Sequence, residues 1–217
     1  MFAVVFERLL AHYGLQQWWP ADNQLEIMVG AVLVQRTVWR NAANAIARLK
    51  ASGDLRTDRI SALPSQRLEE LIRPAGFFKV KAKRLQALCR LVAAAGGIAE
   101  LERLPTQELR NTLLGVHGVG AETADAILGY AFKRPVFVVD AYARRLFGRL
   151  AYPCAVPTDD ELKAGCEREL KTVWRLNELH ALVIAHGKAS CGRVPACSRC
   201  SLASACGFAR HALPASA

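Results

Sequence analysis

The sequence has no apolar run long enough to cross a bilayer, since stretches such as Ala181–Ala185 fall far short of the roughly 20 residues that a span needs. It also has no basic segment ahead of an apolar one at its N-terminus, where Glu7 and Arg8 interrupt the apolar residues. The N-terminal residues therefore predict an amphipathic helix and no export signal. These two absences argue against a membrane-spanning or exported chain.

Acidic residues are scarce as well: 19 Asp and Glu face 29 Lys and Arg among 217 residues, which gives a net charge of +10. A basic balance of this kind favours a polyanionic partner, most often nucleic acid, and ordinary solubility charge is the alternative. Hydrophobic residues make up 52% of the chain, which excludes disorder. The length suits one or two compact domains with an apolar core.

Strand patterns are nearly missing. The one strand-like run, Pro135–Val139, has no second strand to pair with, so we expect it to be an extended connector. Most of the chain shows helical spacing, with a break at Arg73–Gly76 and a connector at Asp54–Leu63 that holds a short helical turn. The fold class is therefore predicted to be all-α. Helices are expected over residues 1–14, 25–49, 65–72, 80–95, 106–114, 121–132, 140–150, 159–169 and 176–187.

A glycine-rich turn, Gly115–Gly120, separates two of these helices. Glycines there permit positive φ and let backbone amides approach a phosphate, while the dipole of the following helix points at the same anion. Val119 is expected to plug the turn into the core. The pattern predicts a phosphate-binding hairpin, and a plain helix–helix connection is the alternative. The expected contacts are His117, Gly118, Val119 and Gly120.

Four of the seven cysteines gather near the C-terminus with the spacing C-x5-C-x2-C-x5-C, whereas Cys89, Cys154 and Cys166 are scattered. Without an export signal disulfides are not expected, so the cluster indicates a metal or iron–sulfur site. Four thiolates in one loop hold either tetrahedral zinc or a [4Fe–4S] cluster, and the spacing alone leaves both open. The predicted ligands are Cys191, Cys197, Cys200 and Cys206.

Two segments carry a family resemblance: G-V-G-A-E-T-A-D-A-I-L-x-Y-A-F and, after it, V-F-V-V-D-A-Y-A-R-R-L. They resemble the helix-hairpin-helix DNA glycosylase superfamily, specifically its endonuclease III family, and the resemblance runs from about Trp18 to Cys206. It implies a two-lobed all-α fold. A six-helix barrel lobe with the hairpin is expected over residues 22–134, and an iron–sulfur cluster lobe over residues 1–21 plus 135–217. It also favours [4Fe–4S], because the family loop carries C-x6-C-x2-C-x5-C, one residue longer in the first gap.

The resemblance makes Asp140 the expected catalytic carboxylate, because it follows Gly120 by the family's interval of about twenty residues. A carboxylate near C1′ of the deoxyribose stabilises the positive charge that develops as the glycosidic bond breaks. The alternative role for Asp140 is to cap the helix that starts after it, and both roles are compatible.

Glu122 stands where bifunctional members of the family carry a lysine that attacks C1′ and forms a Schiff base. A carboxylate cannot form that imine, so a water-using, monofunctional glycosylase is predicted. Glu122 is a second candidate catalytic residue that contacts the base or polarises water. Its alternative role is an acidic residue favourable to the helix dipole.

Motifs W-W-P, G-A-V-L-x-Q-x-T and R-P-x-G-F-x-x-x-K-A-K-R-L resemble the 3-methyladenine glycosylase branch of the family. In that branch aromatics from two places sandwich the base, which assigns base binding to Trp18, Trp19 and Trp39. Indole faces attract the cationic N3-methyladenine by about 0.5–2 kcal/mol each. Gln35 resembles the residue that fills the gap left by the flipped base, and a polar helix end is its alternative role.

The stretch Arg73–Leu85 concentrates basic residues beside an aromatic pair. We expect it to follow backbone phosphates, and a solvated basic face is the alternative. The predicted DNA contacts in this stretch are Lys81, Lys83 and Arg84.

We therefore expect a cytoplasmic, nucleoid-associated glycosylase of bacterial type that acts as a monomer on double-stranded DNA with a flipped-out damaged base. It removes alkylated purines, chiefly 3-methyladenine, and leaves an abasic site. One alternative is an endonuclease III-like oxidised-pyrimidine glycosylase whose AP lyase activity comes from another lysine, such as Lys188. The other alternative is a non-catalytic, cluster-bearing DNA-binding protein.

Overall fold

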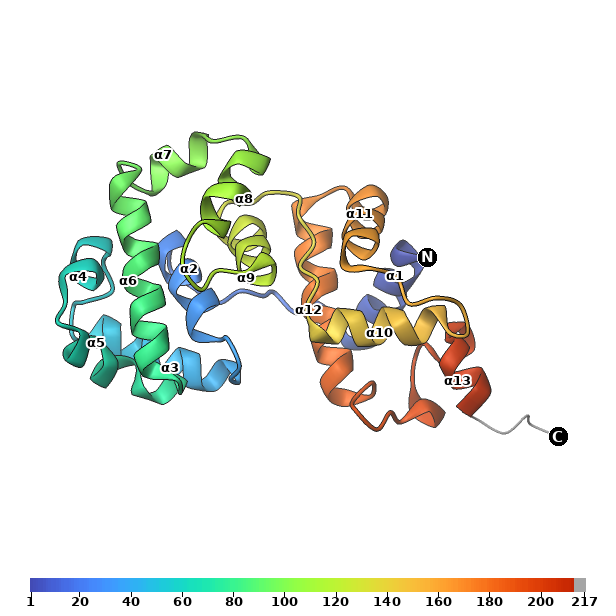
Figure 1. Ribbon diagram of the computed structural model, residues 1–217. Coiled ribbons are helices and arrows are strands. Elements are labelled where there is room, and N and C mark those ends of the chain that lie inside the picture. The colour runs from blue at the N-terminus through green and yellow to red at the C-terminus, as the bar shows by residue number, and fades with distance from the viewer. Residues whose placement is uncertain (213–217) are drawn as a thin grey trace. The chain divides into compact units, whose positions relative to one another are not determined.

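The computed structural model describes residues 1–212, and these residues form helices and connectors with no strand among them, as the all-α prediction expects (Figure 1). They divide into two compact units. The terminal unit comprises Met1–Trp18 and the described residues from Pro135 onward, and the central unit comprises Trp19–Arg134. No helix in the described part of the chain combines the length and apolarity that a membrane span requires.

The central unit is built around two helices with strongly buried faces. Helix α2 (Gln24–Leu33) is buried continuously from Glu26 to Leu33, and α6 (Phe78–Ala94) packs against it and against α4 and α5 (Figure 1). The remaining elements are α3 (Trp39–Ala51), α4 (Thr57–Ala62), α5 (Ser65–Ile72), the 3-10 turn η1 (Arg73–Ala75), α7 (Ile98–Arg103), α8 (Thr106–Leu114), α9 (Ala121–Ala126) and the π-helical turn η2 (Ile127–Ala131).

The predicted helix over residues 25–49 is two helices, which corrects the expectation. α2 ends at Leu33 and α3 begins at Trp39. Between them Arg36 has a φ of 54°, a left-handed conformation that ends a right-handed helix, and Val38 is extended. The break therefore places Gln35 on a turn between helices.

The terminal unit has α12 (Val173–Ala189) in contact with α1 (Phe2–Tyr13), α10 (Ala141–Ala151) and α11 (Asp159–Leu170); α10 crosses α12 in Figure 1. Phenylalanines from both chain segments of the unit pack in its core. The rings of Phe2 and Phe147 meet edge to face, with centroids 5.0 Å apart. The connector before α10 is extended and buried from Val136 to Val139, as predicted. The C-terminal loop forms η3 (Cys197–Arg199), η4 (Ala203–Ala205) and α13 (Gly207–Ala212).

Candidate functional site

The hairpin turn of the central unit needs its second glycine for two reasons. Gly118 has a φ of 84°, and a Cβ there would lie 2.4 Å from Cγ of Arg84. Val119 is 5% exposed, which confirms that it plugs the turn into the core. His117 and Gly120 are exposed. The turn therefore presents main chain and an imidazole outward on a rigid base.

A side-chain network ties this turn to the end of α2. Gln35 Nε2 donates to Gly118 O at 3.1 Å and to Thr123 Oγ1 at 2.9 Å, while Gln35 Oε1 accepts from Arg84 Nη1. The aliphatic part of Arg84 lies across Gly118. In this arrangement Gln35 and Arg84 support the hairpin, and their contacts with DNA stay predictions.

The predicted phosphate contact of Lys81 is wrong. Its side chain is 1% exposed, and Nζ donates to Leu33 O and to Ala75 O, each at 2.8 Å. The ammonium thus satisfies carbonyls at the ends of α2 and η1, which have no partner within their own helices. Burial, with a smaller contribution from nearby Arg84, lowers the pKa of Lys81 to about 8. Lys83 is exposed and remains available to a phosphate.

The central unit brings two of the predicted base-binding aromatics together. The rings of Trp19 and Trp39 meet edge to face, with centroids 5.2 Å apart and planes at 83°. Rings in direct contact leave no gap for a base between Trp19 and Trp39 in this arrangement. Base binding by Trp18, Trp19 and Trp39 stays a prediction. Trp19 also packs on Gly30 and on Tyr130, whose centroid is 5.3 Å away. Sequence reasoning missed Tyr130, although it lies within the family-like segment after the hairpin.

Two further predicted site residues, Trp18 and Glu122, lie in different units. Trp18 is the last residue of the N-terminal segment of the terminal unit and is half-buried. Glu122 is exposed on the first turn of α9 in the central unit. A carboxylate at this position is favourable to the helix dipole, which supports its alternative role without excluding another.

Asp140 in the terminal unit is the N-cap of α10, and its Oδ1 accepts from Ala143 N at 2.8 Å. Its capping role is therefore confirmed. Oδ2 lies 3.7 Å from Nε2 of His180 on α12, and both side chains are buried. Burial alone raises the pKa of Asp140, but His180 and the N–H groups of Ala143 and Tyr142 outweigh it, so the pKa lies below its ordinary value. The carboxylate is thus ionised at neutral pH.

Helix α12 supplies two further buried polar contacts. Glu178 Oε1 accepts a hydrogen bond from Gln16 N, two residues before Trp18. His186 Nδ1 lies 2.9 Å from Tyr13 Oη, and burial, with His12, lowers the pKa of His186 to about 4. Its imidazole is therefore neutral at pH 7. Lys188, the alternative lyase nucleophile, is exposed on the last turn.

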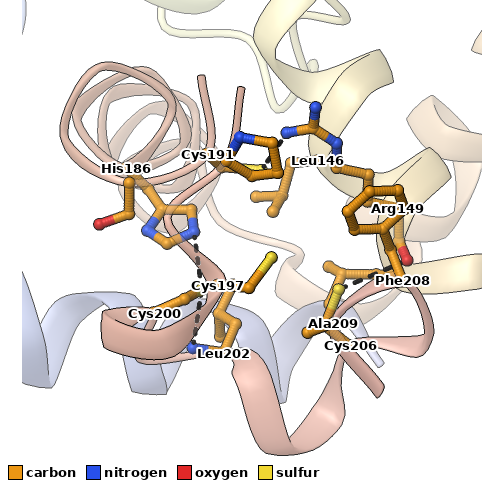
Figure 2. Close-up of a pocket in the computed structure, with 13 residues that line it drawn as sticks. Leu146, Arg149, His186, Cys191, Cys197, Cys200, Leu202, Cys206, Phe208 and Ala209 are labelled. Atoms are coloured by element: carbon orange, nitrogen blue, oxygen red, sulfur yellow. Dashed lines mark hydrogen bonds between the residues drawn. The ribbon is translucent and has the colours of Figure 1, made fainter. Parts of the chain in front are cut away.

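The four clustered cysteines line one pocket of the terminal unit (Figure 2). They are free thiols. Arg149 Nη1 donates to Cys191 Sγ at 3.1 Å and to Gly192 O at 2.7 Å, and Leu202 N donates to Cys200 Sγ at 3.4 Å. His186 Nε2 lies 3.5 Å from Cys200 Sγ. Burial raises the pKa of Cys197 and Cys200 despite these N–H groups. Four cysteine sulfurs around one pocket fit a sulfur-bound inorganic group by residue type.

The four cysteine side chains are not arranged around a single metal ion. Across residues 1–212, no group of three or more His, Cys, Asp and Glu side chains is arranged to hold a metal ion. The iron–sulfur site at these four cysteines therefore stays a prediction.

Comparison with known proteins identifies the family. The model of the HhH-GPD superfamily of base excision DNA repair proteins matches residues 29–172. The candidate DNA repair glycosylase MJ1434 of Methanocaldococcus jannaschii is 40% identical over 95% of this chain and 96% of its own. The H. pylori 3-methyladenine DNA glycosylase MagIII, solved with 1,N6-ethenoadenine, has a TM-score of 0.73 at 26% identity, over 86% of this chain and 96% of MagIII.

A trapped endonuclease III–DNA covalent intermediate shares the fold, with a TM-score of 0.81 at 21% identity, over 98% of this chain and 97% of that one. The chain therefore belongs to the HhH-GPD superfamily of base excision DNA repair proteins. The resemblance predicted from the motifs is confirmed, and with it the class of activity, DNA glycosylase.

Proposed function

We propose that the chain is a monofunctional glycosylase that hydrolyses the N-glycosidic bond of alkylated purines, chiefly 3-methyladenine, in double-stranded DNA. It acts as a monomer on a flipped-out nucleotide and leaves an abasic site. The observation that carries the proposal is the buried, ionised Asp140 in a chain that has Glu122 at the usual lysine position.

The reaction needs little beyond a fixed negative charge. The bond between C1′ and the base nitrogen breaks with its electron pair going to the base, and a cationic 3-methyladenine leaves as a neutral molecule. Asp140 stabilises the oxocarbenium-like sugar, and water then adds to C1′ and loses a proton. Because the base departs readily, a single carboxylate suffices and no acid is required at the base.

Aromatic faces support an alkylated, cationic base. Trp19 is fixed by Gly30 and Tyr130, so it forms a rigid wall behind Trp39. Trp39, half-buried in the same unit, is proposed to stack on the flipped base, and half-buried Trp18 of the terminal unit is a second candidate. The 26% identical MagIII is a 3-methyladenine glycosylase, which supports the same substrate class here.

The four pocket cysteines are proposed to bind a [4Fe–4S] cluster. Four cysteines that line one pocket offer the four thiolates that such a cluster needs, one for each iron. When bound, the cluster would close the C-terminal loop by covalent bonds. Arg149 donates to Cys191 Sγ and to the carbonyls of Gly192 and Arg193, which fixes the loop to α10.

The test is release of free base from methylated duplex DNA under single-turnover conditions. Wild type is expected to release 3-methyladenine, and Asp140→Asn to do so about 100-fold more slowly or worse. Asparagine also caps helices well, so this variant keeps the fold. Duplex carrying an oxidised pyrimidine is the matched substrate control. Release from that duplex alone would contradict the alkylpurine assignment, and no release from either would contradict the enzymatic one.

A further inference from the structure

We infer that His180 is a positioning residue that holds the Asp140 carboxylate in its working orientation. The inference rests on the proposed role of Asp140. His180 carries no role in the functional prediction from sequence, because it follows Asp140 by 40 residues and lies on a different helix.

The two carboxylate oxygens of Asp140 have different surroundings. Oδ1 accepts from Ala143 N at 2.8 Å and is used by the helix cap. Oδ2 lies 3.7 Å from Nε2 of His180. Capping fixes one oxygen, and a polar partner on the second oxygen restrains rotation of the carboxylate further. His180 is in place to be that partner.

Burial makes this contact consequential. His180 is 6% exposed and Asp140 is 8% exposed, so water screens their interaction little. A buried carboxylate is costly unless hydrogen-bonded groups or charges favour it, and His180 is the side chain that lowers the pKa of Asp140. An imidazole at this position thus maintains both the orientation and the charge of the group that faces the sugar cation.

The backbone fixes the imidazole as firmly as the carboxylate. His180 is on α12, which packs directly on α10, the helix that Asp140 caps. On either side of His180 in α12, Glu178 binds Gln16 N and His186 contacts Tyr13, so neighbouring polar groups anchor the helix to the N-terminal segment. The distance between His180 and Asp140 is therefore set by helix packing and not by loops.

The experiment compares binding to two abasic-site analogues in duplex DNA, one with a cationic pyrrolidine ring and one with neutral tetrahydrofuran. An oriented anion prefers the cationic ring, so the affinity ratio reports the carboxylate directly. We expect His180→Ala to lower this ratio and the single-turnover rate by about tenfold, the size expected for losing one polar contact to a buried charge. His180→Gln, whose amide nitrogen reaches about as far as Nε2, is expected to stay within about threefold of wild type.

Three outcomes are decisive. If wild type shows no preference for the cationic analogue, or Asp140→Asn keeps it, the proposed function of Asp140 fails. If Asp140→Asn loses the preference while His180→Ala retains both preference and rate, the function stands and the inference is overturned. Equal loss in His180→Gln and His180→Ala, with both folded in thermal unfolding, also overturns it. Exposed His12→Ala is the control for removing a histidine elsewhere in the same unit.

Discussion

The two units hold their candidate groups in opposite ways. In the terminal unit the groups with proposed chemistry, Asp140 and His180, are buried and fixed by a helix cap and by helix packing. In the central unit the residues predicted to contact DNA, such as His117 and Lys83, are exposed, and the buried cation Lys81 donates to main-chain carbonyls of the protein. Burial thus accompanies proposed catalysis in one unit and architecture in the other.

This difference explains why a basic segment is a poor guide to DNA contact. Lys81 and Lys83 are two positions apart on α6, so they point to different sides of the helix. One is 1% exposed and the other is exposed. Substitutions in the segment should therefore separate into stability effects and binding effects.

The largest effect is expected for Lys81→Met, which removes both hydrogen bonds of the buried ammonium. Two buried carbonyls lose their donor, so the free energy of unfolding should fall by about 2–4 kcal/mol at pH 7. Denaturant unfolding measures this loss. Lys83→Met is the matched control and should change the free energy by no more than about 0.5 kcal/mol. Equal stability of the two variants would contradict the architectural role of Lys81.

The same residue predicts a pH dependence. The pKa of Lys81 is about 8 in the fold and 10.5 in the ordinary state, so between these values the unfolded chain binds more protons. Stability contributed by this group therefore rises with pH from about 8 to 10.5, and below pH 8 the cost of burying the charge is fully present. Lys81→Met should abolish that rise in unfolding measurements across this window.

A smaller effect is expected from the hairpin turn. Gly118→Ala meets a φ of 84° and the side chain of Arg84, so we expect a loss of about 1–3 kcal/mol in stability together with weaker DNA binding. Gly120→Ala is the control, because Gly120 has a φ of −92° and an added Cβ meets nothing within 4 Å. Thermal unfolding and duplex titration check both. Equal tolerance of the two changes would refute the constraint at Gly118.

The smallest effect is expected for Lys83→Ala, which removes one exposed charge. DNA affinity should fall uniformly across sequences, and the slope of log affinity against log salt should decrease by about 1. Titration at several salt concentrations measures the slope. An unchanged slope would show that Lys83 does not contact the DNA phosphates.

The local features were predictable from sequence. Helix α5 begins after Pro64 and ends where the break at Arg73 was expected, because proline and apolar spacing are local signals. The cap at Asp140 follows from its residue type before a helix. The hairpin turn was predictable because its glycines are also a local signal.

The contacts that assemble the site were not predictable, because they join residues far apart in the chain. Lys81 Nζ reaches Leu33 O across 48 positions, and Trp19 packs on Tyr130 from the other end of the central unit. Arg36 breaks the predicted long helix through a backbone conformation that side-chain periodicity does not report. His180 shows the same limit, since only helix packing brings it to Asp140.

The central claim is that Asp140 acts without an amine nucleophile. Borohydride reduction during reaction with damaged or abasic duplex DNA tests it most directly, because only a Schiff base is trapped as a protein–DNA adduct. The account predicts released base, an intact strand and no adduct. A trapped adduct from wild type, lost in Lys188→Gln, would contradict it and assign the chain to the lyase-type glycosylases.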